Sequence, residues 1–460
     1  MKSRIVILLF AAFCFLITIK RADQWADRLY EWDISGYHLH LPAAIIYGDI
    51  EKLTFYSYID DVYKPTGDLR NYCLYDTENG NRVNRYSIGV AVFDLPFFLI
   101  AHFINVSFLD FPADGYSLPY QWATIISNIF WVAFGLFLLY FFLRRHFSDM
   151  VVAMTLAAIG FGTNLFTYVV FRPGMSHTYS FFCFSLLLLL TDSFYRDRRK
   201  INLYMIGAVL GLIGLIRIPN LVVVIIPLLW GVYNKQTFID RYEFLKARFP
   251  GVMASALCFI GVMMIQLGYW KYVAGTWIYD GYQNEGFLWS EPAIYSGLFS
   301  FHKGWFVYTP MAVFMVLGIY TMKYKFRQYI PAISIFFILN LYIVFSWGNW
   351  WYGGGFSARA LIESLAILAL PLATFIQYMR AKMNTVWKSA FYVIISFLVF
   401  LNVFQSYQFS KGIFDHELNS REYYFKAFLK VNVTDDDRKY MLKDSVVTEI
   451  HRERTEQFKK

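Results

Sequence analysis

The sequence predicts an all-α polytopic membrane protein with about 11 transmembrane helices. The first indication is composition. The 460 residues are 57% hydrophobic and only 16% charged, whereas soluble globular chains average about 25% charged residues. The second is a series of apolar runs long enough to cross a hydrocarbon core of about 30 Å. The third is an alternation of basic and charge-poor loops between these runs, which is typical of membrane proteins. Together they argue against a water-soluble enzyme, and the 21% aromatic content argues against a disordered chain.

The apolar runs define the expected spans. These cover residues 5–19, 121–143, 150–171, 177–195, 201–218, 220–233, 251–274, 305–322, 329–347, 359–379 and 389–406. The first run follows a short basic start, as in a signal peptide, but its flank Lys20-Arg21-Ala22-Asp23 lacks the small-residue cleavage pattern. We therefore expect an uncleaved first span whose flanking Lys20 and Arg21 reach the interface.

The direction of the chain follows from the basic loops. Lys and Arg crowd one alternating set of loops, which should be cytoplasmic like Lys2 and Arg4. The rich set contains Arg144, Arg145, Arg196, Arg198, Arg199, Lys200, Lys235, Arg241, Lys246, Arg248, Lys323, Lys325, Arg327, Arg380, Lys382 and Lys388. The alternation holds only if the apolar stretch 86–106 does not cross the membrane. It is therefore expected to be an interfacial, juxtamembrane helix inside a large external loop, residues 20–120.

This topology predicts a transmembrane domain over residues 1–406 and a polar tail over residues 407–460. The N-terminus is expected in the cytoplasm and the tail outside a cytoplasmic (inner) membrane, where it forms a small helical appendage. The net charge of +9 is explained by the cytoplasmic loops, so nucleic acid is not an expected partner.

The segment after the first span carries a candidate catalytic acid or base. Asp33 and Tyr37 are four residues apart and share one face of a helix, with Glu31 just before them. A carboxylate at the membrane surface can deprotonate a hydroxyl group. The alternative is an Asp that caps a helix or is simply solvated. His38 and His40 are two residues apart and do not share a helical face, so they do not indicate a metal site. A divalent metal stays an open alternative, and no specific cofactor is predicted.

Five basic residues lie on the expected outer side of the membrane, against the enrichment of Lys and Arg on the cytoplasmic side. Arg85, Arg172, Arg217, Lys303 and Arg359 each lie at the outer end of an apolar segment. Cations that converge at one membrane depth can bind a phosphate. The alternative is that each is an ordinary interfacial anchor. His177, His302, Trp351 and Tyr352 flank these cations and are candidates for substrate binding, together with Glu31, Tyr37 and Arg172. The glycines at 353–355 lack the ending of a phosphate-binding P-loop and instead predict close approach of backbone to a ligand.

The layout and several motifs resemble GT-C superfamily glycosyltransferases. The closest likeness is to the branch that holds protein O-mannosyltransferases and the aminoarabinose transferase of lipid A. Residues 33–37 look like the family's Asp-Glu-x-x-Tyr motif, residues 85–89 open the juxtamembrane helix, and residues 211–219 resemble a recurrent Arg-Pro element. Residues 297–310 and 350–359 look like late signatures of bacterial members. The likeness covers residues 1–406, but the family's second acidic residue is replaced by Ile34.

The resemblance implies an inverting transfer of a sugar from a polyprenyl-phosphate donor to a glycan, lipid or protein acceptor at the outer membrane face. Asp33 would be the catalytic base, and Arg85, Arg217, Lys303 and Arg359 would bind the donor phosphate. Three alternatives stay open at this stage: a flippase or transporter of lipid-linked glycans, an envelope polymer ligase or polymerase, and a non-catalytic assembly protein.

Overall fold

The computed structural model describes residues 1–26, 28–67, 69–283 and 285–459. Among these residues, eight helices are long and apolar enough to cross a membrane. They are α1 (Lys2–Lys20), α5 (Gly89–Phe108), α6 (Leu118–Arg144), α9 (Ser176–Asp197), α13 (Phe249–Ala274), α17 (Ile330–Ser346) with the preceding η3 (Arg327–Tyr329), α18 (Ser364–Lys382) and α19 (Thr385–Ser410). The prediction of a mostly helical protein is confirmed, and these eight helices are compatible with a polytopic membrane protein by their length and composition.

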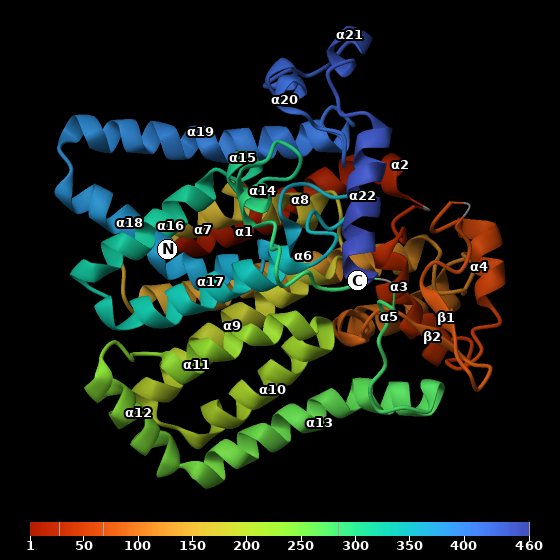
Figure 1. Cartoon of the computed structure of the whole chain (residues 1–460), viewed down its shortest axis with the longest axis horizontal. Coiled ribbons are helices and arrows are strands. Elements are labelled where there is room, and N and C mark those ends of the chain that lie inside the picture. Colours follow the sequence, from red (N-terminus) through yellow and green to blue (C-terminus); the bar gives the residue numbers. More distant parts are fainter. Residues whose placement is uncertain (27, 68, 284, 460) are drawn as a thin grey trace.

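Shorter apolar helices complete the bundle. These are α7 (Asp149–Gly162), α10 (Lys200–Ile216), η1 (Ile218–Val224) with α11 (Ile225–Leu229), and α16 (Met311–Thr321) with η2 (Met322–Tyr324). Helices α9 and α18 form the buried centre, whereas α13 lies along one edge with little of its surface covered (Figure 1). The remaining connections contain α12 (Lys235–Lys246), α14 (Ile294–Phe299), α15 (Trp305–Tyr308) and η4 (Arg359–Leu361).

The run expected as one span at 150–171 is broken into α7 and α8 (Leu165–Val170). At the break, the Thr163 hydroxyl donates to the carbonyl of Ile159 at 2.6 Å, so the side chain competes with the backbone ladder. Asn402 of α19 then donates to the carbonyls of Phe161 and Thr163 at 2.9 and 2.7 Å. The freed carbonyls are therefore satisfied by a neighbouring helix, which apolar surroundings require.

Residues 20–120, which the sequence predicts to lie outside the membrane and which we call the external segment for that reason, gather at one end of the bundle, to the right in Figure 1. It contains α2 (Ala22–Trp25), α3 (Asp33–Ile45) and α4 (Tyr56–Tyr63), and a hairpin of β1 (Leu74–Asp76) and β2 (Arg82–Asn84) with Tyr75 opposite Val83. The N-terminus, α12 and the α18–α19 connection lie at the opposite end. The basic loops are thus separated from this segment by the length of the bundle.

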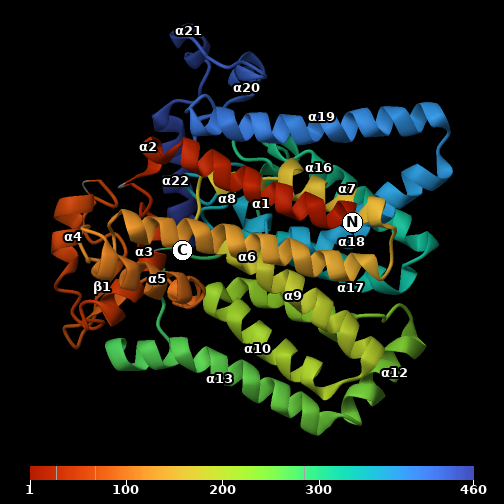
Figure 2. The ribbon, with the colours of Figure 1, turned by 180° about the vertical axis from the view of Figure 1, so that it is seen from behind.

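Helix α5 takes the place of the expected interfacial helix, shifted slightly to Gly89–Phe108. It is seen nearly end-on in Figures 1 and 2, whereas α6, α13 and α19 run across both pictures, so α5 lies across the bundle. Its first residue packs tightly, because a Cβ at Gly89 would lie 2.5 Å from the carbonyl oxygen of Leu215 in α10. This contact brings residues 85–88 next to Arg217, which follows α10.

The tail contains α20 (Arg421–Ala427), α21 (Asp435–Arg438) and α22 (Asp444–Lys459). It packs on the bundle through Phe414 and Tyr424, whose rings lie 5.7 and 5.5 Å from that of Tyr308. Arg454 of α22 donates to the carbonyl of Gly348 at 3.3 Å. The tail is therefore in contact with the loop that follows α17.

Candidate functional site

A cavity of about 970 Å³ lies where the external segment meets the ends of several apolar helices. We call it the Asp33 cavity. Its walls come from segments far apart in the sequence: residues 31–34, 37, 72, 85–87, 168, 172, 175, 216–219, 280, 282, 285–287, 289, 347, 349, 352–354, 359 and 416–417. Eight of the residues singled out from the sequence line it: Glu31, Asp33, Tyr37, Arg85, Arg172, Arg217, Tyr352 and Arg359.

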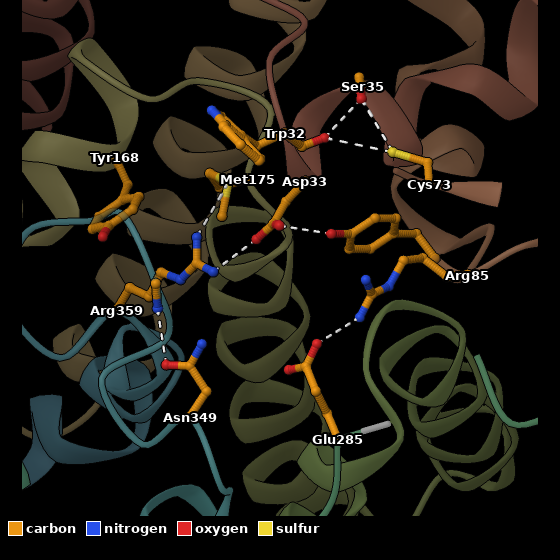
Figure 3. A network of polar contacts seen from close by, with 12 residues as sticks. Trp32, Asp33, Ser35, Cys73, Arg85, Tyr168, Met175, Glu285, Asn349 and Arg359 are labelled. Atoms are coloured by element: carbon orange, nitrogen blue, oxygen red, sulfur yellow. Dashed lines mark hydrogen bonds and ion pairs between the residues drawn. The ribbon is translucent and has the colours of Figure 1, made fainter. Parts of the chain in front are cut away.

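Asp33 is the first residue of α3 and is held through both carboxylate oxygens. Arg359 donates from an Nη to Oδ2 at 2.7 Å (Figure 3). The Tyr86 hydroxyl donates to Oδ1 at 2.7 Å. The preceding Trp32 has φ 51°, a conformation that is costly for an aromatic residue and persists where its surroundings enforce it. Its carbonyl accepts from the Ser35 hydroxyl at 2.7 Å, which holds the turn before Asp33.

The electrostatics of Asp33 favour the ionised form. Burial alone raises the pKa of this carboxyl, but the charge of Arg359 and the hydrogen bond from Tyr86 outweigh it, and the charge of Arg217 adds to them. The net pKa lies below the ordinary Asp value. The position at a helix N-terminus acts in the same direction. Asp33 is therefore an anion at neutral pH.

Arg359 follows the glycine-rich loop expected to approach a ligand. Tyr352 and Ser357 in this loop both have positive φ values, and the Gly353 amide donates to the side chain of Asn349 at 3.2 Å. Besides its bond to Asp33, the guanidinium makes a long 3.9 Å contact with the sulfur of Met175. Its Nε has no hydrogen-bond partner among the described residues. Arg359 therefore still has an N–H group that can donate to a ligand beside the Asp33 carboxylate.

Arg217 is the cation with the most capacity for a ligand. It follows α10 in extended conformation and lies over the ring of Tyr352 at 5.6 Å. Within the part of the chain that the structure describes, its side chain forms no hydrogen bond and no ion pair. An unneutralised guanidinium in a cavity offers a bidentate site for a carboxylate or phosphate.

Arg85 is already paired. Its guanidinium donates to Glu285 at 2.9 Å (Figure 3), only 7% of its side chain is exposed, and it lies 4.7 Å from the ring of Tyr282. A Cβ at Gly281 would lie 2.3 Å from the carbonyl oxygen of Arg85, so the two chain segments touch through their backbones. Arg85 therefore ties the 280–289 loop to the external segment.

Lys303 lies behind the cavity wall. It is 2% exposed, and its Nζ donates to the carbonyls of Gly353, at 2.9 Å, and Gly355. Burial lowers the pKa of this ammonium to about 7. Its contacts place it beneath the glycine-rich loop, with its ammonium directed at the loop carbonyls.

The other expected residues divide into two groups. Glu31 and Arg172 face each other in the cavity at 3.8 Å. His177 is outside it, buried against Glu363 at 3.2 Å. His302 and Trp351 pack on each other, with ring centres 5.7 Å apart, and Trp351 also contacts His451 of α22.

The structure adds Tyr86, Glu285 and Asn349 to the site. Tyr86 lies within the motif at 85–89, but nothing in its local pattern separates it from the chain's other tyrosines. Asn349 follows Trp347-Gly348, and Glu285 lies in an irregular loop. Asn349 bonds Gly353, 4 residues away along the chain, whereas Glu285 bonds Arg85, 200 residues away. Only the Asn349 contact is local enough for a turn signal to reveal it.

The described residues contain no group of three or more His, Cys, Asp or Glu side chains placed to hold a metal ion. His38 and His40 turn to different backbone carbonyls, those of Gly115 at 2.7 Å and Tyr86 at 3.0 Å.

No protein-family model matches this chain, and no curated protein shows significant similarity to it.

Proposed function

We propose that the protein transfers a sugar, with inversion, from a polyprenyl-phosphate donor to an acceptor hydroxyl at the outer membrane face. The observation that carries the proposal is that ionised Asp33 and Arg217, which has no hydrogen-bond or ion-pair partner among the described residues, line one cavity at the ends of apolar helices. A lipid-linked donor needs such a position, because its chain lies in the membrane while its sugar reaches water.

The chemistry assigns Asp33 as the base. The bond between the anomeric carbon and the phosphate oxygen breaks, and the acceptor oxygen bonds to the opposite face of that carbon. The acceptor proton goes to Asp33, and polyprenyl phosphate leaves with the electron pair of the broken bond. Since the pKa of Asp33 is low, it accepts the proton late, when the sugar resembles an oxocarbenium ion and the hydroxyl has become acidic.

Arg217 and Arg359 are assigned to the leaving phosphate. Arg217 supplies a guanidinium that has no hydrogen-bond or ion-pair partner among the described residues. Arg359 links the leaving phosphate to the catalytic base through its 2.7 Å bond to Asp33. Fixed cations stabilise charge that develops on a leaving group. Arg85, neutralised by Glu285, is assigned to holding the cavity wall, and Lys303 to supporting the glycine-rich loop.

The proposed topology is GT-C-like. The N-terminus and the basic loops would be cytoplasmic, and the external segment and tail would lie outside. The crosswise placement of α5 and its exposed Phe103 and Phe108 support an interfacial helix (Figure 2).

The decisive experiment replaces Asp33 by Asn. In one assay, the purified full chain is incubated with a panel of polyprenyl-phosphate sugars and transfer is measured. In a second assay, mass spectrometry compares envelope glycans and glycoproteins from cells with and without the protein, which identifies the product. Asp33→Asn should abolish transfer, while the chain still folds. Asp61→Asn, a matched change at an exposed carboxylate of α4, should keep wild-type transfer. Full transfer by Asp33→Asn would refute the assignment.

A flippase for lipid-linked glycans is the second candidate. It is favoured by the fully buried His177–Glu363 pair, because ionisable groups buried within a membrane bundle often mark transport paths. Reconstituted vesicles separate the two functions. A flippase moves labelled lipid-linked sugar between leaflets and leaves it chemically intact, whereas a transferase releases polyprenyl phosphate.

A further inference from the structure

Tyr86 makes a contact with Asp33 that the proposed roles do not use. Its hydroxyl donates to Oδ1 at 2.7 Å, while Arg359 occupies Oδ2 (Figure 3). Each carboxylate oxygen has two lone-pair positions. One lone-pair position on each oxygen is occupied, and these two hydrogen bonds fix the plane of the carboxylate. The other position on each oxygen stays available to an incoming hydroxyl.

The fold is built locally to place this tyrosine. A Cβ at Gly36 would lie 2.1 Å from a ring carbon of Tyr86, so the ring reaches Asp33 only because residue 36 is glycine. Asn84 donates to the carbonyl of Gly36 at 2.7 Å and accepts from the Tyr86 amide at 3.0 Å. Tyr37 packs edge-on against the ring at 4.9 Å. The tyrosine is therefore held from α3 and from the β2–α5 connection.

We propose that Tyr86 is a positioning residue that orients the carboxylate of Asp33 for the acceptor hydroxyl and limits its basicity. This inference rests on the proposed transfer reaction. Tyr86 keeps its own proton throughout. Its hydrogen bond is strongest to the anion and weakens as Asp33 gains the acceptor proton. The bond therefore opposes early proton transfer and favours attack by a hydroxyl whose proton leaves late.

Tyr86→Phe tests the inference, because it removes only the hydroxyl and keeps the ring against Gly36. We expect kcat to fall about 10–100-fold with the donor KM within about twofold, since the phosphate contacts remain. The acid limb of the kcat profile should move up by about one to two pH units, because a hydrogen bond to the charged form is lost. Tyr58→Phe, an exposed tyrosine of α4, should behave as wild type.

Gly36→Ala provides an independent test by displacing the ring. Its effect on kcat and that of Tyr86→Phe should be strongly non-additive in the double variant, because both remove the same hydrogen bond. A merely structural role would lower kcat without moving the acid limb, and that result overturns the inference. So does unchanged activity of Tyr86→Phe while Asp33→Asn is inactive. An active Asp33→Asn would instead overturn the transfer reaction itself.

Discussion

The ion pair between Asp33 and Arg359 can be tested by its stability as well as its activity. Arg359→Ala leaves a carboxylate in the cavity with only Tyr86 and distant charges to compensate it. Removing one partner of a fully buried pair costs about 3–5 kcal/mol. Here the side chains of Arg359 and Asp33 are 12% and 19% exposed, and water in the cavity reduces the cost. We expect a loss of about 2 kcal/mol in the free energy of unfolding.

The pH dependence of this loss has a defined sign. In the wild type, the folded-state pKa of Asp33 lies below its unfolded value. The pair therefore stabilises the fold above about pH 4, and this contribution disappears as the pH falls through the folded-state pKa. In Arg359→Ala, burial becomes dominant and raises the pKa of Asp33 above the unfolded value. The stability of the variant should then fall as the pH rises from about 4 to 7.

Denaturant titration of the purified chain in detergent micelles, repeated across this pH range, measures both effects. The double variant Arg359→Ala/Asp33→Asn should recover most of the stability lost by Arg359→Ala, because no uncompensated charge remains. Arg70→Ala, at an exposed pair with Asp61, serves as the control and should cost at most about 1 kcal/mol. A loss in Arg359→Ala no larger than in this control, or one that Asp33→Asn does not relieve, would contradict the pairing.

Two further predictions concern the other cations. Arg217→Ala should cost at most about 1 kcal/mol in the free energy of unfolding, because among the described residues its side chain forms no hydrogen bond or ion pair and lies only over the ring of Tyr352 at 5.6 Å. It should raise the donor KM about tenfold or more in the transfer assay, and an unchanged KM would argue against a phosphate role. Lys303→Met should remove a pH-dependent contribution to the free energy of unfolding. The Lys303 pKa of about 7 lies below the unfolded value near 10.4, so the wild type gains stability as the pH rises from about 7 to 10. The variant should lack this slope in denaturant titrations, and an identical slope in both proteins would rule out Lys303 as its source.

Sequence reasoning located many of the helices because hydropathy is a local property. The run at 251–274 corresponds to α13, Phe249–Ala274, and the run at 389–406 lies within α19, Thr385–Ser410. It missed the break at Thr163, because the Asn402 side chain that satisfies the freed carbonyls comes from another helix. The run at 220–233 is divided into η1 and α11, and Pro227 lies in the first turn of α11, where it has no amide to donate to the carbonyl of Val223.

The candidate site shows the same limit. Unusual charges in apolar surroundings identified Asp33, Arg217 and Arg359, because a charge near membrane depth is costly and needs a partner or a ligand. The same reasoning grouped Lys303 and Arg85 with them, although Lys303 contacts backbone carbonyls and Arg85 is paired with Glu285. Sequence position alone does not distinguish a cation that faces a cavity from one that supports its wall.

By itself, the sequence determined the class of protein, most of its helices and the few charges out of place, since each depends on composition or on residues within a helix turn. Only the tertiary structure decided which of those charges meet. Asp33 and Arg359 are 326 residues apart, and Arg85 and Glu285 are 200 apart. Close backbone approaches at Gly89 and Gly281 bring the segments around Arg217, Arg85 and Glu285 together, and Gly36 leaves room for the ring of Tyr86 beside Asp33. Such approaches are set by how helices and loops pack, and no local pattern encodes them.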